Sequence, residues 1–280
     1  MKCYYHNDLD GRCAGAIVFH SVSIKEQNRE YKSEMIELDY KDEIEIEKIL
    51  PNEQIWIVDF SFKPEIMEEV FKKTTDIVWI DHHKTADEYK YSRGIKGLRI
   101  TEDKKFSGCE LTWQYVHPDL PMPRAVELIG DRDKWAWKFG DDTAWFNQAI
   151  KLYDHKPTDE IWITLLFSDK QDEQCKSIMV EGSICLKFRD SICKDYCDHY
   201  GFETKFEGYK CFANGIYMFG SEGFGDRFKK YDICISYEFT SKNWIVGLYS
   251  TTIDVGEIAK KYGGGGHKGA SGFVCKELPF

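Results

Sequence analysis

The segment "KCYYHNDLDG", Lys2–Gly11, carries the pattern from which the fold can be read. Its first four residues resemble a short strand, and "GRCAGAIVFHSV", which starts at Gly11, has the small and apolar spacing of a helix packed on a sheet. Between the two, His6, Asp8 and Asp10 stand at every second position. Titratable groups this close repel one another unless a cation lies among them. We therefore predict a strand, a cation site and a helix, in that order.

The same alternation of strand and helix continues along the first half of the chain. The helix before the fourth strand is expected to have Ser61 as its cap and Pro64 in its first turn. Apolar β-rich runs that alternate with helices indicate an α/β fold with a doubly wound parallel sheet. Helices cover both faces of such a sheet, and the connections between its strands are right-handed. The further strands are predicted at 34–39, 54–58 and 76–80.

The length of 280 residues and the 42% hydrophobic content are enough for two domains. We predict an α/β domain over 1–178, which contains the cation site, a helical connector over 179–200 and a smaller α/β domain over 201–280. In the first domain, S-x-x-E at 107–110 is the capping box of another helix. The predicted elements of the second domain are strands at 210–219, 232–239 and 244–250 and a helix near 255–262.

Acidic and imidazole side chains stand at the ends of three N-terminal strands. Asp59 follows the third strand, and the "DHH" run Asp81–His83 follows the fourth. The carboxyl ends of parallel strands face one crevice, so these side chains should converge on the first cluster. Asp10 or Asp59 alone would read as a helix cap, but three such endings favour a metal site. Carboxylates and imidazoles without a thiolate suit Mn²⁺ or a similar divalent ion better than a structural zinc.

Composition excludes several classes of function. The ten cysteines form no CxxC pair, which favours reduced thiols, and the group Cys193, Cys197 and His199 is better explained by packing than by metal binding. No apolar run of membrane-spanning length and no signal pattern is present, so we expect a cytoplasmic protein without a membrane partner. The net charge is −10, with residues 201–280 nearly balanced at ten basic against nine acidic residues, which argues against binding to long duplexes.

A glycine-rich run, "GGGGHKGASG" at 263–272, is the second unusual segment. Its six glycines allow positive φ angles and would present backbone N–H groups to an anion, although a flexible linker has the same composition. Trp135, Trp137 and Trp244 are aromatic residues that either stack on a base or pack in the core. The candidate substrate-binding residues of the run are Gly264, Gly265, Gly266, His267 and Lys268.

Together, "HNDLDG", the isolated Asp59, "DHH" and "GGGGHKGASGF" resemble the motifs of the DHH phosphoesterase superfamily with its DHH-associated C-terminal domain. The resemblance implies an active site in the cleft between two domains and two divalent ions, usually Mn²⁺. His6 and Asp8 would hold the first ion, Asp10 and His82 the second, and Asp59 would bridge them. Many relatives have the first histidine four residues before the first aspartate, whereas here the spacing is two, so the role of His6 is less firmly implied.

The resemblance also implies roles for residues near the ligands. The fourth motif of the family is an aspartate, for which "GDRDKW" offers Asp131 as the first choice and Asp133 as the second. Arg132 is a candidate phosphate contact because it adjoins Asp131. His83 would donate a hydrogen bond to the phosphoryl group as a catalytic residue, and Asp81 would orient a neighbouring imidazole.

The superfamily includes nanoRNases, single-strand-specific exonucleases, cyclic-dinucleotide phosphodiesterases and family II pyrophosphatases. We expect an enzyme that uses a hydroxide activated by two metal ions to hydrolyse short oligonucleotides, or linear or cyclic dinucleotides, to mononucleotides. The alternatives are a pyrophosphatase, a 3′-phosphoadenosine phosphatase, or a protein that binds small nucleotides without cleaving them. The sequence leaves the substrate length, the base preference and the oligomeric state open, a homodimer included.

Overall fold

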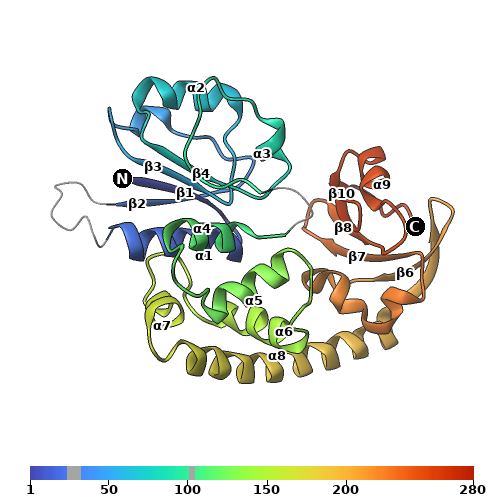
Figure 1. Cartoon of the computed structure of the whole chain (residues 1–280). Coiled ribbons are helices and arrows are strands. Elements are labelled where there is room, and N and C mark those ends of the chain that lie inside the picture. Colours follow the sequence, from blue (N-terminus) through green and yellow to red (C-terminus); the bar gives the residue numbers. More distant parts are fainter. Residues whose placement is uncertain (24–32, 101–104) are drawn as a thin grey trace. The chain divides into compact units, whose positions relative to one another are not determined.

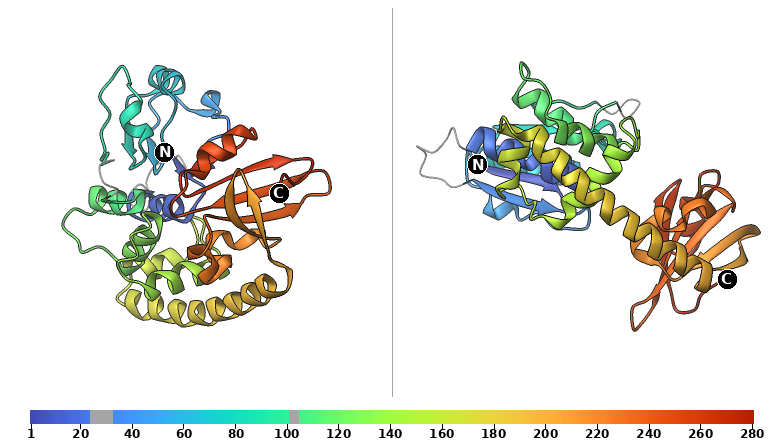
Figure 2. Two further views of the ribbon diagram at one scale, coloured as in Figure 1. Left: turned by 90° about the vertical axis from the view of Figure 1, so that its right-hand side faces the viewer. Right: turned by 90° about the horizontal axis from the view of Figure 1, so that it is seen from below.

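The computed structural model describes residues 1–23, 33–100 and 105–280 and divides into two compact units, Met1–Ser183 and Ile184–Phe280. The division falls inside helix α8 (Gln171–Tyr200), which Figure 2 shows as one continuous helix. The segment predicted as a helical connector is therefore helical. Each unit has its own sheet and its own core, and each is described by itself below.

The N-terminal unit contains a parallel sheet of four strands, β1 (Lys2–His6), β2 (Glu34–Leu38), β3 (Ile55–Val58) and β4 (Ile77–Ile80). Their order in the sheet is β2-β1-β3-β4, and every pairing is parallel. All four strands lie where the sequence predicts them. Helices α1 (Leu9–Val18) and α4 (Gly108–Val116) lie against one face of this sheet, and α2 (Pro64–Lys73) lies against the other (Figure 1).

Both faces of this sheet are buried, as a doubly wound fold requires. Side chains of β1 alternate between the two faces: Cys3 and Tyr5 pack in the cluster that contains α1, whereas Tyr4 packs in the cluster that contains α2. Strand β3 alternates in the same way, with Val58 on the first face and Ile57 on the second. This two-residue alternation explains why the strands read as continuous apolar runs.

Two predicted helix starts in this unit have different outcomes. The capping box is confirmed, because the Ser107 side chain accepts from the N–H of Glu110 and the Glu110 carboxylate accepts from the N–H of Ser107. In α2, Pro64 occupies the first turn, but the cap is Lys63 and not Ser61. Ser61 lies too far before the helix, and its hydroxyl donates to Asp81 instead. The helices of the unit before α8 are α1 (Leu9–Val18), α2 (Pro64–Lys73), α3 (Thr85–Glu88), α4 (Gly108–Val116), α5 (Arg124–Asp133), α6 (Asp141–Ala149) and α7 (Ile161–Phe167).

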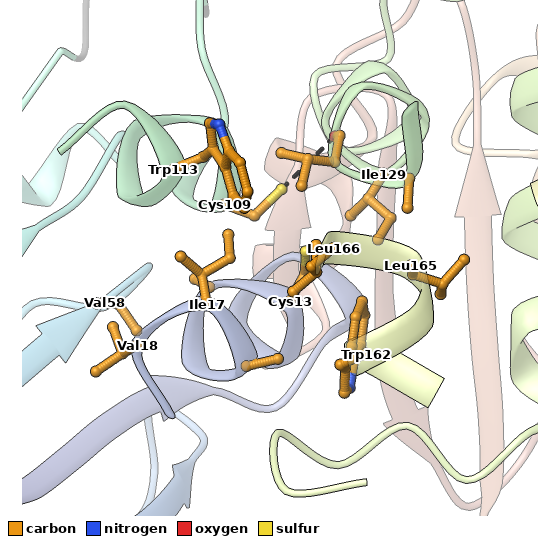
Figure 3. Packing of buried hydrophobic residues seen from close by; sticks show 14 of the residues in the cluster. Cys13, Ile17, Val18, Val58, Cys109, Trp113, Ile129, Trp162, Leu165 and Leu166 are labelled. Atoms are coloured by element: carbon orange, nitrogen blue, oxygen red, sulfur yellow. Dashed lines mark hydrogen bonds between the residues drawn. The ribbon is translucent and has the colours of Figure 1, made fainter. Parts of the chain in front are cut away.

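The core beneath the sheet explains several of the cysteines. Figure 3 shows Cys13 and Cys109 among apolar side chains from α1, α4, α5 and α7. The Cys109 thiol donates to the carbonyl of Val126. All ten cysteines lie in described segments and all are free thiols, as the sequence predicts. Cys193 and Cys197 are buried in the second unit, where Cys197 accepts a hydrogen bond from Asn214.

The C-terminal unit contains a six-stranded mixed sheet in the order β5-β6-β7-β8-β10-β9. Helix α9 (Val255–Lys261) was predicted, whereas β5 was not, because its residues are largely polar and exposed. The strand predicted over 210–219 ends at Asn214, and a 3₁₀ segment follows at Tyr217–Lys229. The strands are β5 (Phe202–Phe206), β6 (Tyr209–Asn214), β7 (Ile233–Phe239), β8 (Trp244–Tyr249), β9 (Gly265–His267) and β10 (Ala270–Cys275).

The glycine-rich run is not an open loop, which corrects the sequence prediction. Its residues form the hairpin β9–β10, in which Gly265 pairs with Gly272 and His267 with Ala270. The N–H of Gly264 donates to Ala259 over 2.9 Å, so part of its backbone is engaged inside the fold. His267 and Lys268 remain exposed at the turn of the hairpin. Among the described residues no helix is long and apolar enough to cross a membrane.

Candidate metal centre

The carboxyl ends of three parallel strands bring the predicted side chains together. His6 ends β1, Asp59 follows β3, and the histidines of the DHH run follow β4. His6 Nδ1 lies 3.9 Å from Asp59 Oδ2, and His82 Nε2 lies 3.2 Å from Asp59 Oδ1. His83 Nδ1 lies 3.7 Å from the same Oδ1. The convergence expected from the parallel sheet is therefore present, with Asp59 in the middle.

Asp8 joins the cluster because it begins α1. Its Oδ1 accepts from the N–H of Gly11 over 2.8 Å, and its Oδ2 lies 2.7 Å from His6 Nδ1. Burial alone would raise the pKa of Asp8, but the hydrogen bonds from His6 and Gly11 outweigh it and hold the pKa below its usual value. Gly11 is required at this turn, since a Cβ there would lie 2.3 Å from the carbonyl oxygen of His6.

The side chain of Asp10, a residue of α1, contacts the N-terminus of α4, which begins nearly a hundred residues further along the chain. It accepts from the N–H groups of Gly108 and Cys109 over 2.6 and 3.1 Å and from the Ser107 hydroxyl over 2.8 Å. The partial positive charge of a helix N-terminus stabilises such a carboxylate. One interpretation of the sequence made Asp10 a helix cap. Its carboxylate does accept hydrogen bonds at a helix N-terminus, but that helix is α4. The cap of α1 is Asp8.

Asp59 has polar atoms that its surroundings leave unsatisfied. It is fully buried, with a positive φ of 53°, and neither of its carboxylate oxygens makes a hydrogen bond. His82 Nε2, equally buried, also makes none. Burial raises the pKa of Asp59 well above its usual value, and the neighbouring Asp10 and Asp8 carboxylates raise it further. A buried carboxylate without partners is costly, so this set of donors fits a bound divalent cation.

The candidate ligand atoms of these side chains form overlapping groups, each compact enough to hold a metal ion. His6, Asp8 and Asp59 form one group, in which all ligand atoms lie within 4.8 Å of one another. Asp59 recurs in a second group with His82 and His83. The third group, in the described part of the chain, combines Asp10, His82 and Asp133. Asp59 and His82 are each shared between two of these groups.

Of the two aspartates that the sequence offers for the fourth motif, the structure places Asp133, the second choice, beside His82. Which of the two binds a metal ion stays a prediction. Asp133 Oδ2 lies 3.4 Å from His82 Nε2. The buried Asp131 instead accepts from the N–H groups of Lys138 and Phe139 over 2.8 and 3.2 Å and from the Thr143 hydroxyl. Its carboxylate therefore holds the loop between α5 and α6.

Arg132, the predicted phosphate contact, lies against two tryptophans. Its guanidinium carbon is 4.0 Å from the ring centroid of Trp135 and 5.0 Å from that of Trp137. Both tryptophans have positive φ angles, 57° and 54°, which bulky residues rarely adopt. Cation–π contact accounts for the position of Arg132. Its predicted role in substrate binding stays a prediction.

Asp81 orients His83 and lies behind the cluster. Its Oδ1 accepts from His83 Nδ1 over 2.8 Å and from the backbone N–H of His82 over 2.7 Å. Burial would raise the pKa of Asp81, but the hydrogen bonds from His83 and from the Ser61 hydroxyl lower it below the usual value. The contact with Asp81 outweighs the burial of His83 and raises the pKa of that imidazole. Asp81 is thus a positioning residue for the histidine that follows it.

Gly108 lets α4 approach the centre closely, and its replacement has a predictable cost. A Cβ at this position would lie 2.5 Å from the Cβ of Asp59. We expect Gly108→Ala to lower the free energy of unfolding by about 1–3 kcal/mol through overpacking, measured by chemical denaturation. Gly94→Ala is the control, because nothing lies within 4 Å of the added Cβ there. Equal stability of the two variants would contradict this close approach.

The fold and the site together define an α/β domain with carboxylates and imidazoles collected at the carboxyl edge of a parallel sheet. Residues 3–131 match the N-terminal domain of the DHH family. The chain therefore carries a DHH-family domain, whose members are phosphoesterases. This finding agrees with the resemblance drawn from the motifs.

Solved structures similar to this chain include the following two. The DHH domain of a protein described as a member of a ribosomal-protein family has a TM-score of 0.61 at 12% identity, covering 98% of this chain and 82% of that one. The pGpG-specific phosphodiesterase PggH from Vibrio cholerae has a TM-score of 0.53 at 14% identity, covering 98% and 92%. These likenesses show the shared fold.

A viral relative is the uncharacterized protein R106 of Acanthamoeba polyphaga mimivirus. It is 27% identical over 235 residues, which cover 80% of this chain and 53% of that protein. The chain thus spans about half the length of this curated relative.

Proposed function

We propose that the protein is a phosphodiesterase dependent on two divalent ions, most simply Mn²⁺, that cleaves short oligonucleotides or dinucleotides to mononucleotides. The observation that supports it is Asp59: a buried carboxylate, without hydrogen bonds, shared between two groups of ligand atoms. His6 and Asp8 would hold one ion, and Asp10, His82 and Asp133 the other, with Asp59 between them.

Bound divalent ions supply two contributions: they lower the pKa of a water molecule toward neutrality, and they neutralise charge on the phosphoryl oxygens. The residues of the chain supply the rest. Nδ1–H of His83 donates a hydrogen bond to Asp81, and in the protonated imidazole Nε2–H would donate a second one to a phosphoryl oxygen of the substrate. The amides at the start of α4 fix the carboxylate of Asp10, so that a ligand of the second ion is held before the substrate arrives.

In the second unit, the exposed His267 and Lys268 stay the proposed substrate contacts. Their position at the turn of a hairpin, beside glycines, leaves both side chains accessible to an anionic ligand. The hairpin restricts the backbone of Gly265 and Gly266. The amides of these glycines therefore contribute less to anion binding than the amides of an open loop would. Gly264 contributes little in this scheme, because its N–H is already used.

A substrate panel tests the proposal. Purified protein with Mn²⁺ is offered an adenosine dinucleotide, a five-residue oligonucleotide, a cyclic dinucleotide, 3′-phosphoadenosine 5′-phosphate and inorganic pyrophosphate. We expect release of mononucleotides from the shortest diesters and loss of activity with a chelator. Hydrolysis of pyrophosphate or of the 3′-phosphate alone would replace the diesterase assignment by a phosphatase. Tight binding of nucleotides without turnover would make the protein a binder.

A further inference from the structure

Tyr40 lies beside the candidate metal centre, although no motif includes it. It follows β2 by two residues, and Leu38, the last residue of that strand, pairs in register with His6. Tyr40 therefore stands at the same carboxyl edge of the sheet as the metal-binding side chains. Its ring centroid is 5.1 Å from that of His6 and 6.2 Å from that of His83.

One face of the Tyr40 ring packs against a second aromatic ring. It stacks on Phe60, with ring centroids 5.1 Å apart and an interplanar angle of 25°. Phe60 itself belongs to the buried core on the α2 side of the sheet and is only 5% exposed. Tyr40, by contrast, is 51% exposed. Since Phe60 covers one face, the accessible half of Tyr40 includes the opposite face.

The loop that follows β2 positions this ring. The backbone N–H of Tyr40 donates to Asp39 Oδ1 over 2.7 Å, which fixes the loop at this residue. A neutral aromatic ring, backed by a second ring and open on its other face, is a surface on which a nucleobase stacks.

We infer that Tyr40, supported by Phe60, is the stacking platform for the base attached to the phosphate at the metal centre. The ring lies next to His6 and His83, with centroids 5.1 and 6.2 Å away, so a base stacked on its open face would stand beside the metal centre. The substrate is then a nucleotide ester, and inorganic phosphoanhydrides gain nothing from this contact. This inference rests on the proposed function, because it assigns the substrate class of the same site.

The first test compares substrates with and without the base. Wild type, Tyr40→Ala and Tyr40→Phe are assayed with Mn²⁺ on an adenosine dinucleotide and on the same diester with one base removed. Because Tyr40→Ala loses the stacking of one base, we expect its KM for the intact dinucleotide to rise about 5- to 150-fold. We expect kcat to stay within about twofold, the abasic diester to be unaffected, and Tyr40→Phe to behave as wild type.

Phe167→Ala is the matched control, because Phe167 is also partly exposed, at 41%, and packs on Trp113 and His117. It should leave both KM values unchanged. An equal loss on the intact and the abasic diester in Tyr40→Ala would overturn the inference, since the ring would then only support His6.

A binding measurement separates this inference from the proposed function. Calorimetry with Mn²⁺ compares adenosine 5′-monophosphate with ribose 5-phosphate, neither of which requires turnover. We expect wild type and Tyr40→Phe to bind the nucleotide about 5- to 150-fold more tightly, and Tyr40→Ala to lose this preference. If wild type cleaves no diester but keeps the preference, the proposed function fails and the platform stands. If wild type shows no preference, the platform is refuted whatever the activity.

Discussion

Asp59→Asn is expected to abolish turnover and, at the same time, to make the metal-free protein more stable. The substitution keeps the shape of a fully buried side chain whose two oxygens have no hydrogen-bond partner, and removes its charge. Replacement of an unsatisfied buried carboxylate by a neutral amide should raise the free energy of unfolding of the metal-free protein by about 1–3 kcal/mol. Loss of the shared ligand should remove diesterase activity at every metal concentration tested.

The response of stability to Mn²⁺ gives the second readout of this variant. A ligand at 100 times its Kd stabilises the folded state by about 2.7 kcal/mol, which for a unit of this size corresponds to a rise in Tm of about 5–10 °C. We expect wild type and the exposed control Asp119→Asn to show this rise and Asp59→Asn to show little of it. An Asp59→Asn protein that is active and stabilised by Mn²⁺ would contradict the shared-ligand role.

The second large effect separates two aspartates that stand two residues apart. Asp133→Asn should lower kcat/KM by about 10²- to 10³-fold, or roughly 3–4 kcal/mol, because a charged ligand facing His82 is lost. Its free energy of unfolding should change little without metal, since 24% of the side chain is exposed. The activity is measured at saturating Mn²⁺ on the best substrate of the panel.

Asp131→Asn should show the opposite pattern. The carboxylate accepts two backbone N–H groups and the Thr143 hydroxyl, and hydrogen bonds to a charged acceptor contribute about 1.5–3 kcal/mol each. We expect a loss of stability in this range, measured by chemical denaturation, and kcat within a few-fold of wild type in the folded protein. If Asp131→Asn loses activity without losing stability, the assignment of Asp133 is wrong.

Local patterns were sufficient for the sheet and for the edge where the site lies. Strands β3 and β4 were predicted because their side chains are buried on both faces and form short apolar runs. Strands β1 and β2 were predicted from shorter runs with an apolar centre. The capping box at Ser107 was predicted because both of its residues lie within one turn. Parallel strands place their carboxyl ends together, so His6, Asp59 and His82 could be grouped without coordinates.

Other assignments depended on contacts that a sequence pattern does not contain. Asp131 and Asp133 lie on the same helix, and at 3.6 residues per turn their side chains point about 200° apart, so only the packing of α5 decides which one meets His82. The glycine-rich run formed a hairpin because β8 offers it a neighbouring strand.

By itself, then, the sequence determined the four strands of the first unit, their doubly wound sheet and the types of side chain at its edge, because each follows from a periodicity or spacing of a few residues. The tertiary structure alone decided that Asp10 lies on the N-terminus of α4, that Asp133 joins the cluster and that Tyr40 stacks on Phe60. These contacts join segments that are distant along the chain or on opposite sides of one helix, and their geometry is set by how the elements pack.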